Sequence, residues 1–347
     1  MTINQIFTAG VEKNASDIHL AVGKPPIVRV HGKLVELQKM DILTKTKAET
    51  LVLSILSSSQ KEKYIKKREL DLAYEIDNVS RFRVNLHFEK GMPGLVARII
   101  QNKILNMEKI AMPDIVYSLA RLYQGLILLT GPTGCGKSTS LAAIIDLINR
   151  ERACNIVTLE DPIEFTFNSE KSIIRQRQYG FDFLSFPEAL KHVVRQDPNV
   201  IMVGEMRDLE TIATTITLAE TGHLVLATLH TQNAAQTIDR IIDIFPPYQQ
   251  DQIRMQLSLS LAGVISQQLI SGINNDSRIA AREIMINTPA IANLIRENKI
   301  PQIKTIIQTS SDEGMISMDQ SLKQLAEQKL ISKDVARAYA VDPSIIK

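Results

Sequence analysis

Cysteine, excess charge and long apolar runs are all scarce in this sequence. Its 347 residues include two cysteines, Cys135 and Cys154, and carry a formal net charge of +2. Two cysteines provide neither a disulfide framework nor a paired-cysteine zinc motif. A net charge this small does not suggest a nucleic-acid-binding protein. A local basic patch or stripe would be needed to support that function.

The sequence also lacks a recognisable targeting or membrane-spanning segment. Residues 1–5 do not have the charged and then apolar order of a signal peptide. Residues 256–275 carry no charge, but their serines and glutamines make them too polar to span a membrane. The sequence therefore predicts a cytoplasmic protein that does not insert into a membrane and reaches one only through a partner.

The length predicts about two domains. Residues 1–101 mix helical and alternating apolar patterns, which predicts a small α+β domain. Within it, residues 47–67 are predicted to form one helix. Residues 102–113 are the predicted linker.

The second predicted domain covers residues 114–347. Its apolar strands alternate with longer helices, which predicts an α/β fold with a parallel sheet covered on both faces. The predicted strands lie at residues 126–129, 156–159, 200–203 and 224–228. Beyond about residue 282 the chain is predicted to be helical, with a capping box formed by Ser317 and Gln320.

A phosphate-binding motif follows the first strand of this domain. Residues 131–138 fit GxxxxGK[ST] and precede a helical run, which is the context that the motif requires. Backbone N–H groups of such a loop wrap the phosphates, Lys137 neutralises the β- and γ-phosphates, and Ser138 holds Mg²⁺. We therefore predict ATP and Mg²⁺ as cofactors, and we expect Cys135 to be packed rather than redox-active. The predicted binding residues are Gly131, Pro132, Thr133, Gly134, Cys135, Gly136, Lys137, Ser138 and Thr139.

Carboxylates follow the next two predicted strands. Glu160, Asp161 and Glu164 come at the strand end where open α/β sheets place their chemistry. One can orient or deprotonate the attacking water and another can assist the metal, although a solvated acidic loop is the alternative. The following strand ends in Gly204 and Glu205, with glycine where many P-loop enzymes have aspartate. Glu205 is therefore predicted to act on the metal.

The order of these motifs resembles the secretion ATPase superfamily that includes GspE and PulE. The loop at 131–138, LEDPIEF at 159–165, VGEMRD at 203–208 and TGHLVLATLH at 221–230 are similar to that superfamily's Walker A motif, Asp box, Walker B motif and His box. Residues 15–20 together with residues 25–30 resemble its PAS-like N-terminal domain. The resemblance covers nearly the whole chain and implies a RecA-like P-loop NTPase domain after a smaller PAS-like domain.

Two features resemble the type IV pilus retraction branch. Residues 290–297, AIANLIRE, are similar to the branch's AIRNLIRE motif, although Ala292 stands where the motif has arginine. The chain also lacks the extra N-terminal domain and four-cysteine zinc motif of the extension and secretion ATPases. The resemblance implies a homohexameric ATP hydrolase that drives pilin disassembly and twitching motility.

The same resemblance assigns roles to individual residues. Glu164 is the catalytic carboxylate of the Asp box, Glu205 is the Walker B acid, and Glu160 and His223 belong to the nucleotide site. His230 senses the γ-phosphate or the subunit interface, with a structural role as the alternative. A metal site formed by the two histidines is disfavoured, because seven residues along a strand place them on opposite faces.

Arg83 and Arg98 are similar to the paired arginines that secretion ATPases direct toward nucleotide. Arg83 lies on the polar face of an alternating strand, and Arg98 interrupts an apolar run. The resemblance implies that both are arginine fingers, which accelerate phosphoryl transfer by about 10³–10⁵ in well-studied cases. A surface salt bridge is the alternative for each.

The implied partners are an inner-membrane pilus platform protein and, as a further candidate, a companion retraction ATPase. No nucleic-acid partner is expected, and the implied location is the inner face of the cytoplasmic membrane. Three other functions stay open. They are a pilus extension or type II secretion ATPase, an accessory nucleotide-binding ring that regulates a paralogous motor, and a RecA-like DNA motor. The last would need more than the scattered Lys and Arg seen here, which are densest at residues 61–68.

Overall fold

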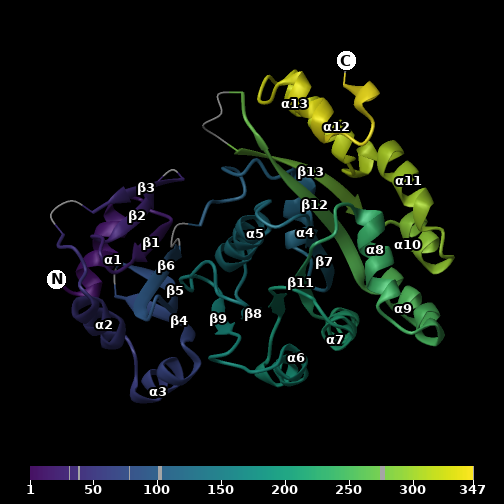
Figure 1. Ribbon diagram of the computed structural model, residues 1–347. Helices are drawn as coiled ribbons and strands as arrows, with labels where there is room; N and C mark the ends of the chain where they lie inside the picture. Colours follow the sequence, from purple (N-terminus) through teal and green to yellow (C-terminus); the bar gives the residue numbers. More distant parts are fainter. Residues whose placement is uncertain (31, 38–39, 78, 101–103, 274–277, 347) are drawn as a thin grey trace. The chain divides into compact units, whose positions relative to one another are not determined.

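The computed structural model describes residues 1–346 apart from 31, 38–39, 78, 101–103 and 274–277 (Figure 1). Contacts divide the chain into two units. The first is Met1–Lys103 with Glu164–Thr166, and the second is Ile104–Ile163 with Phe167–Lys347. The boundary predicted between residues 101 and 102 and the first two residues of the predicted linker lie outside the described residues.

In the described residues, the first unit is built on an antiparallel sheet of six strands in the order β3-β2-β1-β6-β5-β4. Three helices contribute side chains to the same core as this sheet. The elements are α1 (Ile3–Glu12), β1 (Asp17–Leu20), β2 (Ile27–Val30), β3 (Lys33–Glu36), α2 (Lys45–Ser54), α3 (Ser58–Lys67), β4 (Glu69–Ile76), β5 (Ser80–Glu89) and β6 (Met92–Ile100).

Alternation along β5 separates a buried face of this sheet from a polar one. Phe82, Val84 and Leu86 are fully buried and pack in one core with Phe7 of α1. Arg83, between them in sequence, is exposed. Because successive side chains of a strand point to opposite faces, one face of the sheet is covered by helices and the other carries charged groups.

The second unit contains a sheet whose described strands have the order β13-β12-β7-β11-β10-β8-β9. The strands from β12 to β9 are parallel, and β13 is antiparallel to β12. The elements are α4 (Asp114–Ala120), β7 (Gly125–Thr130), α5 (Lys137–Glu151), β8 (Asn155–Glu160), β9 (Ile173–Gln178), α6 (Phe186–Val193), β10 (Val200–Val203), α7 (Leu209–Glu220), β11 (Leu224–Leu229), α8 (Ala234–Asp243), α9 (Pro247–Ser260), β12 (Leu261–Ser271), β13 (Arg278–Ile286), α10 (Pro289–Arg296), α11 (Ile303–Thr309), α12 (Met318–Glu327) and α13 (Lys333–Tyr339). Among the described helices, none combines the length and apolar character needed to cross a membrane.

Helices cover both faces of this second sheet (Figure 1). Along β7, Leu126 and Leu128 pack in the core that α6 to α11 share. Ile127 and Leu129 pack instead in the core that α4 and α5 share. All four side chains are almost fully buried, so the strand is continuously apolar rather than alternating. The four strands expected from such runs are present.

The helix predicted over residues 47–67 is in fact two helices. At the start of α3, the Ser57 hydroxyl accepts a hydrogen bond from the Gln60 N–H, and the Gln60 side chain accepts one from the Ser57 N–H. This capping box satisfies the free N–H groups of a new helix. The serine run at this point therefore ends one helix and begins the next.

The helical region predicted beyond about residue 282 is present, but it begins a few residues later. Strand β13 continues to Ile286 and pairs with β12 through nine successive residues on each strand. Helix α10 begins only at Pro289, where the Thr288 hydroxyl caps it. Strands β9, β12 and β13 were not expected from the sequence. The capping box of Ser317 and Gln320 at the start of α12 is confirmed.

Truncating a central side chain should destabilise the second unit. Leu128 is fully buried in β7, whereas Leu259 on α9 is 65% exposed. We expect Leu128→Ala to lower the free energy of unfolding by about 2–5 kcal/mol, because it removes buried apolar surface and leaves a cavity. Leu259→Ala should change it by less than about 0.5 kcal/mol. Urea unfolding followed by circular dichroism measures both, and equal losses would contradict the packing described.

Candidate nucleotide-binding site

The predicted phosphate-binding loop connects β7 to α5. The Lys137 Nζ donates to the backbone oxygens of Gly131 and Pro132, at 2.8 and 3.1 Å. Ser138 and Thr139 follow in the first turn of α5 and are half-buried. The loop thus surrounds the N-terminus of a 15-residue helix, where free N–H groups and the helix dipole favour an anion.

The glycines of the loop occupy conformations that other residues avoid. Gly131, Gly134 and Gly136 have φ of 138°, 79° and 88°. A Cβ on Gly131 would lie 2.2 Å from the backbone oxygen of Gln267. Only a shift of the main chain could remove this clash. A Cβ on Gly134 would meet nothing within 4 Å, so that part of the loop borders open space. A loop that is pressed against β12 on one side and open on the other fits a cradle for phosphates.

Three side chains from separate strand ends converge beside the loop. The His230 Nδ1 lies 3.4 Å from the Thr133 Oγ1, and its Nε2 lies 3.2 Å from Glu205 Oε1. Glu205 follows β10 and His230 follows β11, two parallel neighbours whose carboxyl ends meet at one edge of the sheet. The structure therefore brings together the loop, the predicted Walker B acid and one of the two predicted His-box residues.

Arg207 completes this cluster and was given no role by sequence reasoning. It donates to Glu205 Oε2 from Nε and Nη2, at 2.8 and 2.7 Å, and its Nη1 lies 3.9 Å from Asp161 Oδ2. The signal was its position two residues after Glu205, close enough in sequence for its guanidinium to reach that carboxylate. Two charge-assisted donors on one oxygen hold Oε2 of Glu205 in place and so orient its carboxylate.

The cluster keeps Glu205 ionised. Partial burial opposes ionisation of this carboxyl, but the hydrogen bond and charge of Arg207, together with the charges of His230 and Lys137, outweigh it and hold its pKa below the usual range. Lys137 is thus close enough to act electrostatically on Glu205. A carboxylate with both oxygens engaged and a lowered pKa is a good acceptor for metal-bound water and a poor general base.

The residues of the Asp box are placed differently from one another. Glu160 is buried, and its Oε1 accepts hydrogen bonds from the Thr158 hydroxyl at 2.6 Å and the Gln176 amide at 3.0 Å. Asp161 lies beside Arg207, as described above. Glu164 is exposed and belongs with the first unit in the division by contacts. Its catalytic role stays a prediction.

His223 does not reach the phosphate-binding loop of its own chain. It precedes β11, whereas His230 follows it. At about 3.3 Å per residue, the strand separates the two histidines by roughly 20 Å. The His223 Nδ1 lies 3.0 Å from the Leu218 backbone oxygen, at the end of the sheet remote from the loop. The assignment of His223 to this nucleotide site is therefore corrected, and the distance also prevents the two histidines from sharing a metal.

Arg83 and Arg98 are direct neighbours in the first unit. They are paired across β5 and β6, and both side chains are exposed. The Arg98 Nε donates to Asp17 Oδ1 at 3.0 Å, so the alternative of a surface salt bridge holds for this arginine in the described structure. The 70% exposure of the Arg98 side chain keeps the rest of its guanidinium accessible. Whether either arginine acts on nucleotide stays a prediction.

The donors near the loop suit a magnesium ion. Ser138 offers a hydroxyl and Glu205 a carboxylate, and Mg²⁺ commonly takes few protein ligands because it keeps waters and binds phosphate oxygens. Burial raises the pKa of the Cys135 thiol, whose side chain is 3% exposed. This environment agrees with the expectation that Cys135 packs against the loop rather than reacting.

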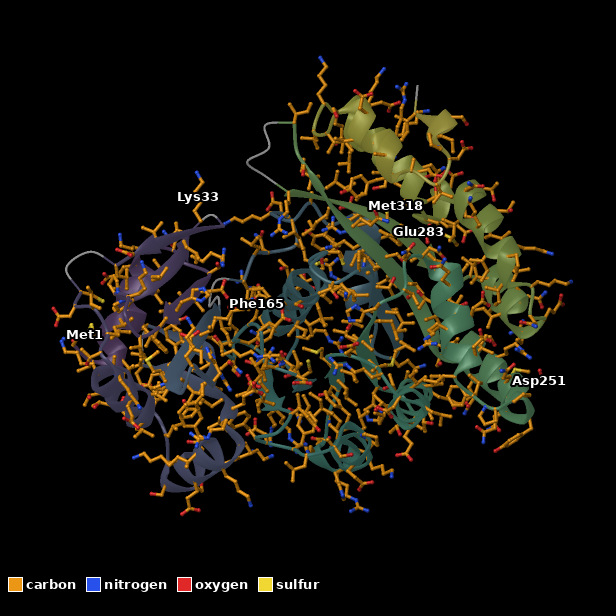
Figure 2. The ribbon with its side chains drawn as sticks, in the orientation of Figure 1. Met1, Lys33, Phe165, Asp251, Glu283 and Met318 are labelled. Carbon is orange, nitrogen blue, oxygen red and sulfur yellow. The ribbon has the colours of Figure 1, made fainter. Side chains whose placement is uncertain are left out.

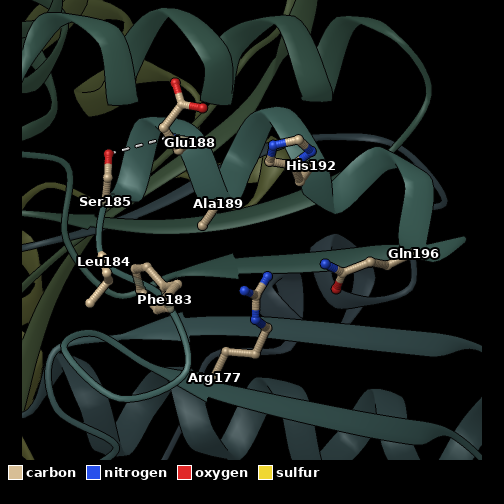
Figure 3. Close-up of a pocket in the computed structure, with 8 residues that line it drawn as sticks. All are labelled: Arg177, Phe183, Leu184, Ser185, Glu188, Ala189, His192 and Gln196. Atoms are coloured by element: carbon tan, nitrogen blue, oxygen red, sulfur yellow. Dashed lines mark hydrogen bonds between the residues drawn. The ribbon is translucent and has the colours of Figure 1, made fainter.

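A separate hollow of about 380 Å³ lies between β9 and α6 (Figure 3). Arg177 and Phe183 border it on one side and the start of α6, capped by Ser185, on the other. It contains none of the predicted site residues.

Comparisons with known proteins show the family to which the chain belongs. A family model described as type II/IV secretion system protein matches residues 1–337. The chain is 44% identical over 343 residues to the type IV pilus retraction ATPase PilT of Pseudomonas aeruginosa, covering 99% of each protein. It is 37% identical over 340 residues to the type IV pilus ATPase PilU of the same organism, covering 98% of this chain and 89% of that one. The crystal structure of the pilus retraction motor PilT with bound ADP superposes with a TM-score of 0.93 at 42% identity, covering 99% of this chain and 98% of that one.

The chain belongs to the type II/IV secretion system protein family. The resemblance drawn from the motifs is thereby confirmed, as is the α/β fold class with a smaller N-terminal unit. The prediction of a P-loop ATPase is confirmed at the level of this family.

Removing Arg207 should change how stability depends on pH. The folded-state pKa of Glu205 is lowered, so its contribution to stability is present above the unfolded-state pKa of about 4.3 and is lost as the pH falls through the folded value. We expect Arg207→Gln to lower the Tm at pH 6–7 and to lower it less below about pH 4.3. In a Glu205→Gln background the same substitution should give a difference that varies less with pH, because only the longer contact with Asp161 remains. Calorimetry from pH 3 to 7 measures this, and a constant difference in both backgrounds would be evidence against the ion pair.

Proposed function

We propose that this chain is an ATP hydrolase that powers retraction of type IV pili. The observation that carries the proposal is the cluster of Lys137, Glu205 and His230 around a phosphate-binding loop, in a chain that matches PilT over its full length. The greater identity to the retraction ATPase than to PilU, 44% against 37%, favours the motor over an accessory ring. The full-length match with a retraction motor likewise favours retraction over extension.

The described residues divide the work of hydrolysis. In this proposal the N–H groups of the loop and Lys137 hold the phosphates, and Thr133 and His230, which lie 3.4 Å apart, sense the terminal phosphate. Bound Mg²⁺, held by Ser138 and through water by Glu205, would offset negative charge on the phosphates. Because both oxygens of Glu205 are engaged, Glu164 is the proposed base that takes a proton from the attacking water.

Arg83 and Arg98 are the proposed arginine fingers. They extend the charged face of the first unit's sheet as a cross-strand pair. Two guanidinium groups side by side suit a triphosphate, since each adds charge-assisted hydrogen bonds to developing negative charge. In this proposal Asp17 holds Arg98 in place through its Nε and leaves the outer nitrogens for the phosphate.

The assembly is proposed to be a homohexamer at the inner face of the cytoplasmic membrane. Its proposed partner is an inner-membrane platform protein of the pilus, and a PilU-like ATPase is the proposed companion. Similarity to the PilT structure and to PilU supports this arrangement. Nucleic acid is not a proposed partner.

Two substitutions should abolish hydrolysis in different ways. Lys137→Ala should weaken ATP binding, because it removes the cation at the phosphates, and Glu164→Gln should preserve binding while reducing kcat by 10²-fold or more. Lys66→Ala, on the exposed last turn of α3, is the control and should leave both values unchanged. Phosphate release and equilibrium dialysis with labelled ATP give the two readouts. Turnover at the parental rate by Glu164→Gln would remove that residue from the mechanism.

Deletion of the gene in the native host tests the direction of force. Loss of a retraction motor should leave cells with excess surface pili and no twitching motility, because extension continues unopposed. The wild-type gene should restore twitching, and the Lys137→Ala gene should not. Electron microscopy of pili and twitching assays on agar score the outcome, and bald cells would indicate an extension ATPase instead.

A further inference from the structure

Gln267 of β12 lies directly under the phosphate-binding loop. Strand β12 runs parallel to β7 with Ser266 opposite Thr130, and the hydroxyls of these two residues are 2.7 Å apart. The next residues along the two strands are Gln267 and Gly131. A Cβ on Gly131 would clash with the backbone oxygen of Gln267. A Cβ on Gly136 would lie 2.9 Å from the side-chain nitrogen of Gln267. Gln267 therefore touches both ends of the loop.

The side-chain amide of Gln267 can point only one way. Its Oε1 accepts hydrogen bonds from the Arg282 Nε at 2.9 Å and the Ser140 hydroxyl at 2.8 Å. A guanidinium is a donor only, so the oxygen has to face Arg282. The Nε2 consequently faces the loop and donates to the backbone oxygen of Cys135 at 2.6 Å.

This hydrogen bond sets the direction of the peptide between Cys135 and Gly136. In a trans peptide the C=O and N–H bonds point in opposite directions. When the Cys135 oxygen turns toward β12, the N–H of Gly136 turns to the other side of the loop. The space beside Gly134 is open, which leaves room for an anion. Such an anion can accept hydrogen bonds from N–H groups that point to this side of the loop.

Arg282 holds Gln267 from the neighbouring strand. The two residues are directly paired across β12 and β13, and both are buried, with Arg282 4% and Gln267 3% exposed. The Arg282 Nη1 and Nη2 donate to the backbone oxygens of Ala111 and Ile110, at 2.9 and 3.0 Å. In the described part of the chain Arg282 forms no ion pair. Burial lowers its pKa to about 10, which leaves it protonated at neutral pH.

Glu283, the next residue, faces the other side of β13. Its carboxylate accepts a hydrogen bond from the Ala234 N–H at 2.8 Å and also binds the backbone at Met318, near which it lies in Figure 2. It caps helices rather than balancing the charge of Arg282. The N–H groups of Arg282 therefore donate to backbone oxygens and to Gln267. Its role in the fold is to orient the Gln267 side chain, not to neutralise a carboxylate.

We propose that Gln267 and Arg282 are positioning residues for nucleotide binding, which keep the Gly136 N–H turned toward the bound phosphates. Arg282 fixes the amide of Gln267, and Gln267 fixes the Cys135–Gly136 peptide. Arg282 is itself held by the backbone oxygens of Ile110 and Ala111. The inference rests on the proposed function only in requiring that the loop binds a nucleotide.

Two substitutions at Gln267 separate positioning from stability. In Gln267→Glu, the introduced carboxylate still accepts from Arg282 and Ser140 and adds a counter-ion, so the fold should be kept, but its second oxygen repels the Cys135 carbonyl. In Gln267→Met, the repulsion is absent, but Arg282 and Ser140 lose their acceptor, which costs stability. We therefore expect Gln267→Glu to be the more stable of the two and to bind ADP the more weakly.

The experiment measures ADP affinity by isothermal titration calorimetry and Tm by differential scanning calorimetry on the full chain. We expect the Kd for ADP to rise about 10- to 100-fold in Gln267→Glu, as for loss of a hydrogen bond to a charged group, and less in Gln267→Met. Gln268→Glu is the matched control, because this half-buried neighbour lies on the other face of β12, and its Kd should stay within twofold of the parent.

The ranking of the variants decides between the explanations. If affinity falls in step with Tm, so that Gln267→Met binds ADP more weakly than Gln267→Glu, the proposal is overturned and the network is structural. Parental affinity in both variants would overturn it as well. If Gln267→Glu does not fold, parental affinity in Gln267→Met overturns the proposal. If Gln267→Met does not fold, a Kd of Gln267→Glu within twofold of the Gln268→Glu control overturns it. Absence of ADP binding by the unaltered chain would overturn the proposed function too, which distinguishes the two failures.

Discussion

A loop can direct its N–H groups toward phosphates only if its carbonyls find donors elsewhere, and much of this structure follows from that requirement. Lys137 donates to the oxygens of Gly131 and Pro132, and Gln267 donates to that of Cys135. Glycines at φ of 79° to 138° permit the loop to turn in this way. The fold supplies the remaining donor by pairing β12 alongside β7, so the outer hairpin of the sheet is part of the nucleotide site.

The opposite side of the loop depends on the parallel order of the central strands. Because β7, β11 and β10 are adjacent and parallel, their carboxyl ends bring Thr133, His230 and Glu205 to one place. Arg207 contacts the carboxylates of both Glu205 and Asp161 and so links the ends of β10 and β8. The cluster holds Glu205 charged and oriented.

Local sequence predicted the residues that the chain itself places next to one another. The P-loop, the acids after each strand and the capping box at Ser317 are such features, because strand, turn and helix are adjacent in sequence. Gln267 and Arg282 could not be found this way, since their contact depends on the register of two strands that lack clear alternation. The motif grouped His223 with His230 because the two are close in sequence. They lie at opposite ends of β11, and an extended strand keeps its two ends far apart.

Gly204 explains why this Walker B strand carries its acid one residue later than in many P-loop enzymes. A Cβ at this position would lie 3.1 Å from the Leu159 oxygen and 3.3 Å from the Glu160 Cα, tighter than most contacts of real side chains. The Gly204 oxygen also accepts a hydrogen bond from the Thr228 hydroxyl of β11. With glycine here, the ends of β8, β10 and β11 approach closely, so Arg207 can contact both Asp161 and Glu205, and Glu205 also lies beside His230. An aspartate at position 204 would require the backbone of β8 at residues 159–160 to move by a few tenths of an ångström, so in this sheet the glycine and the displaced acid fit together.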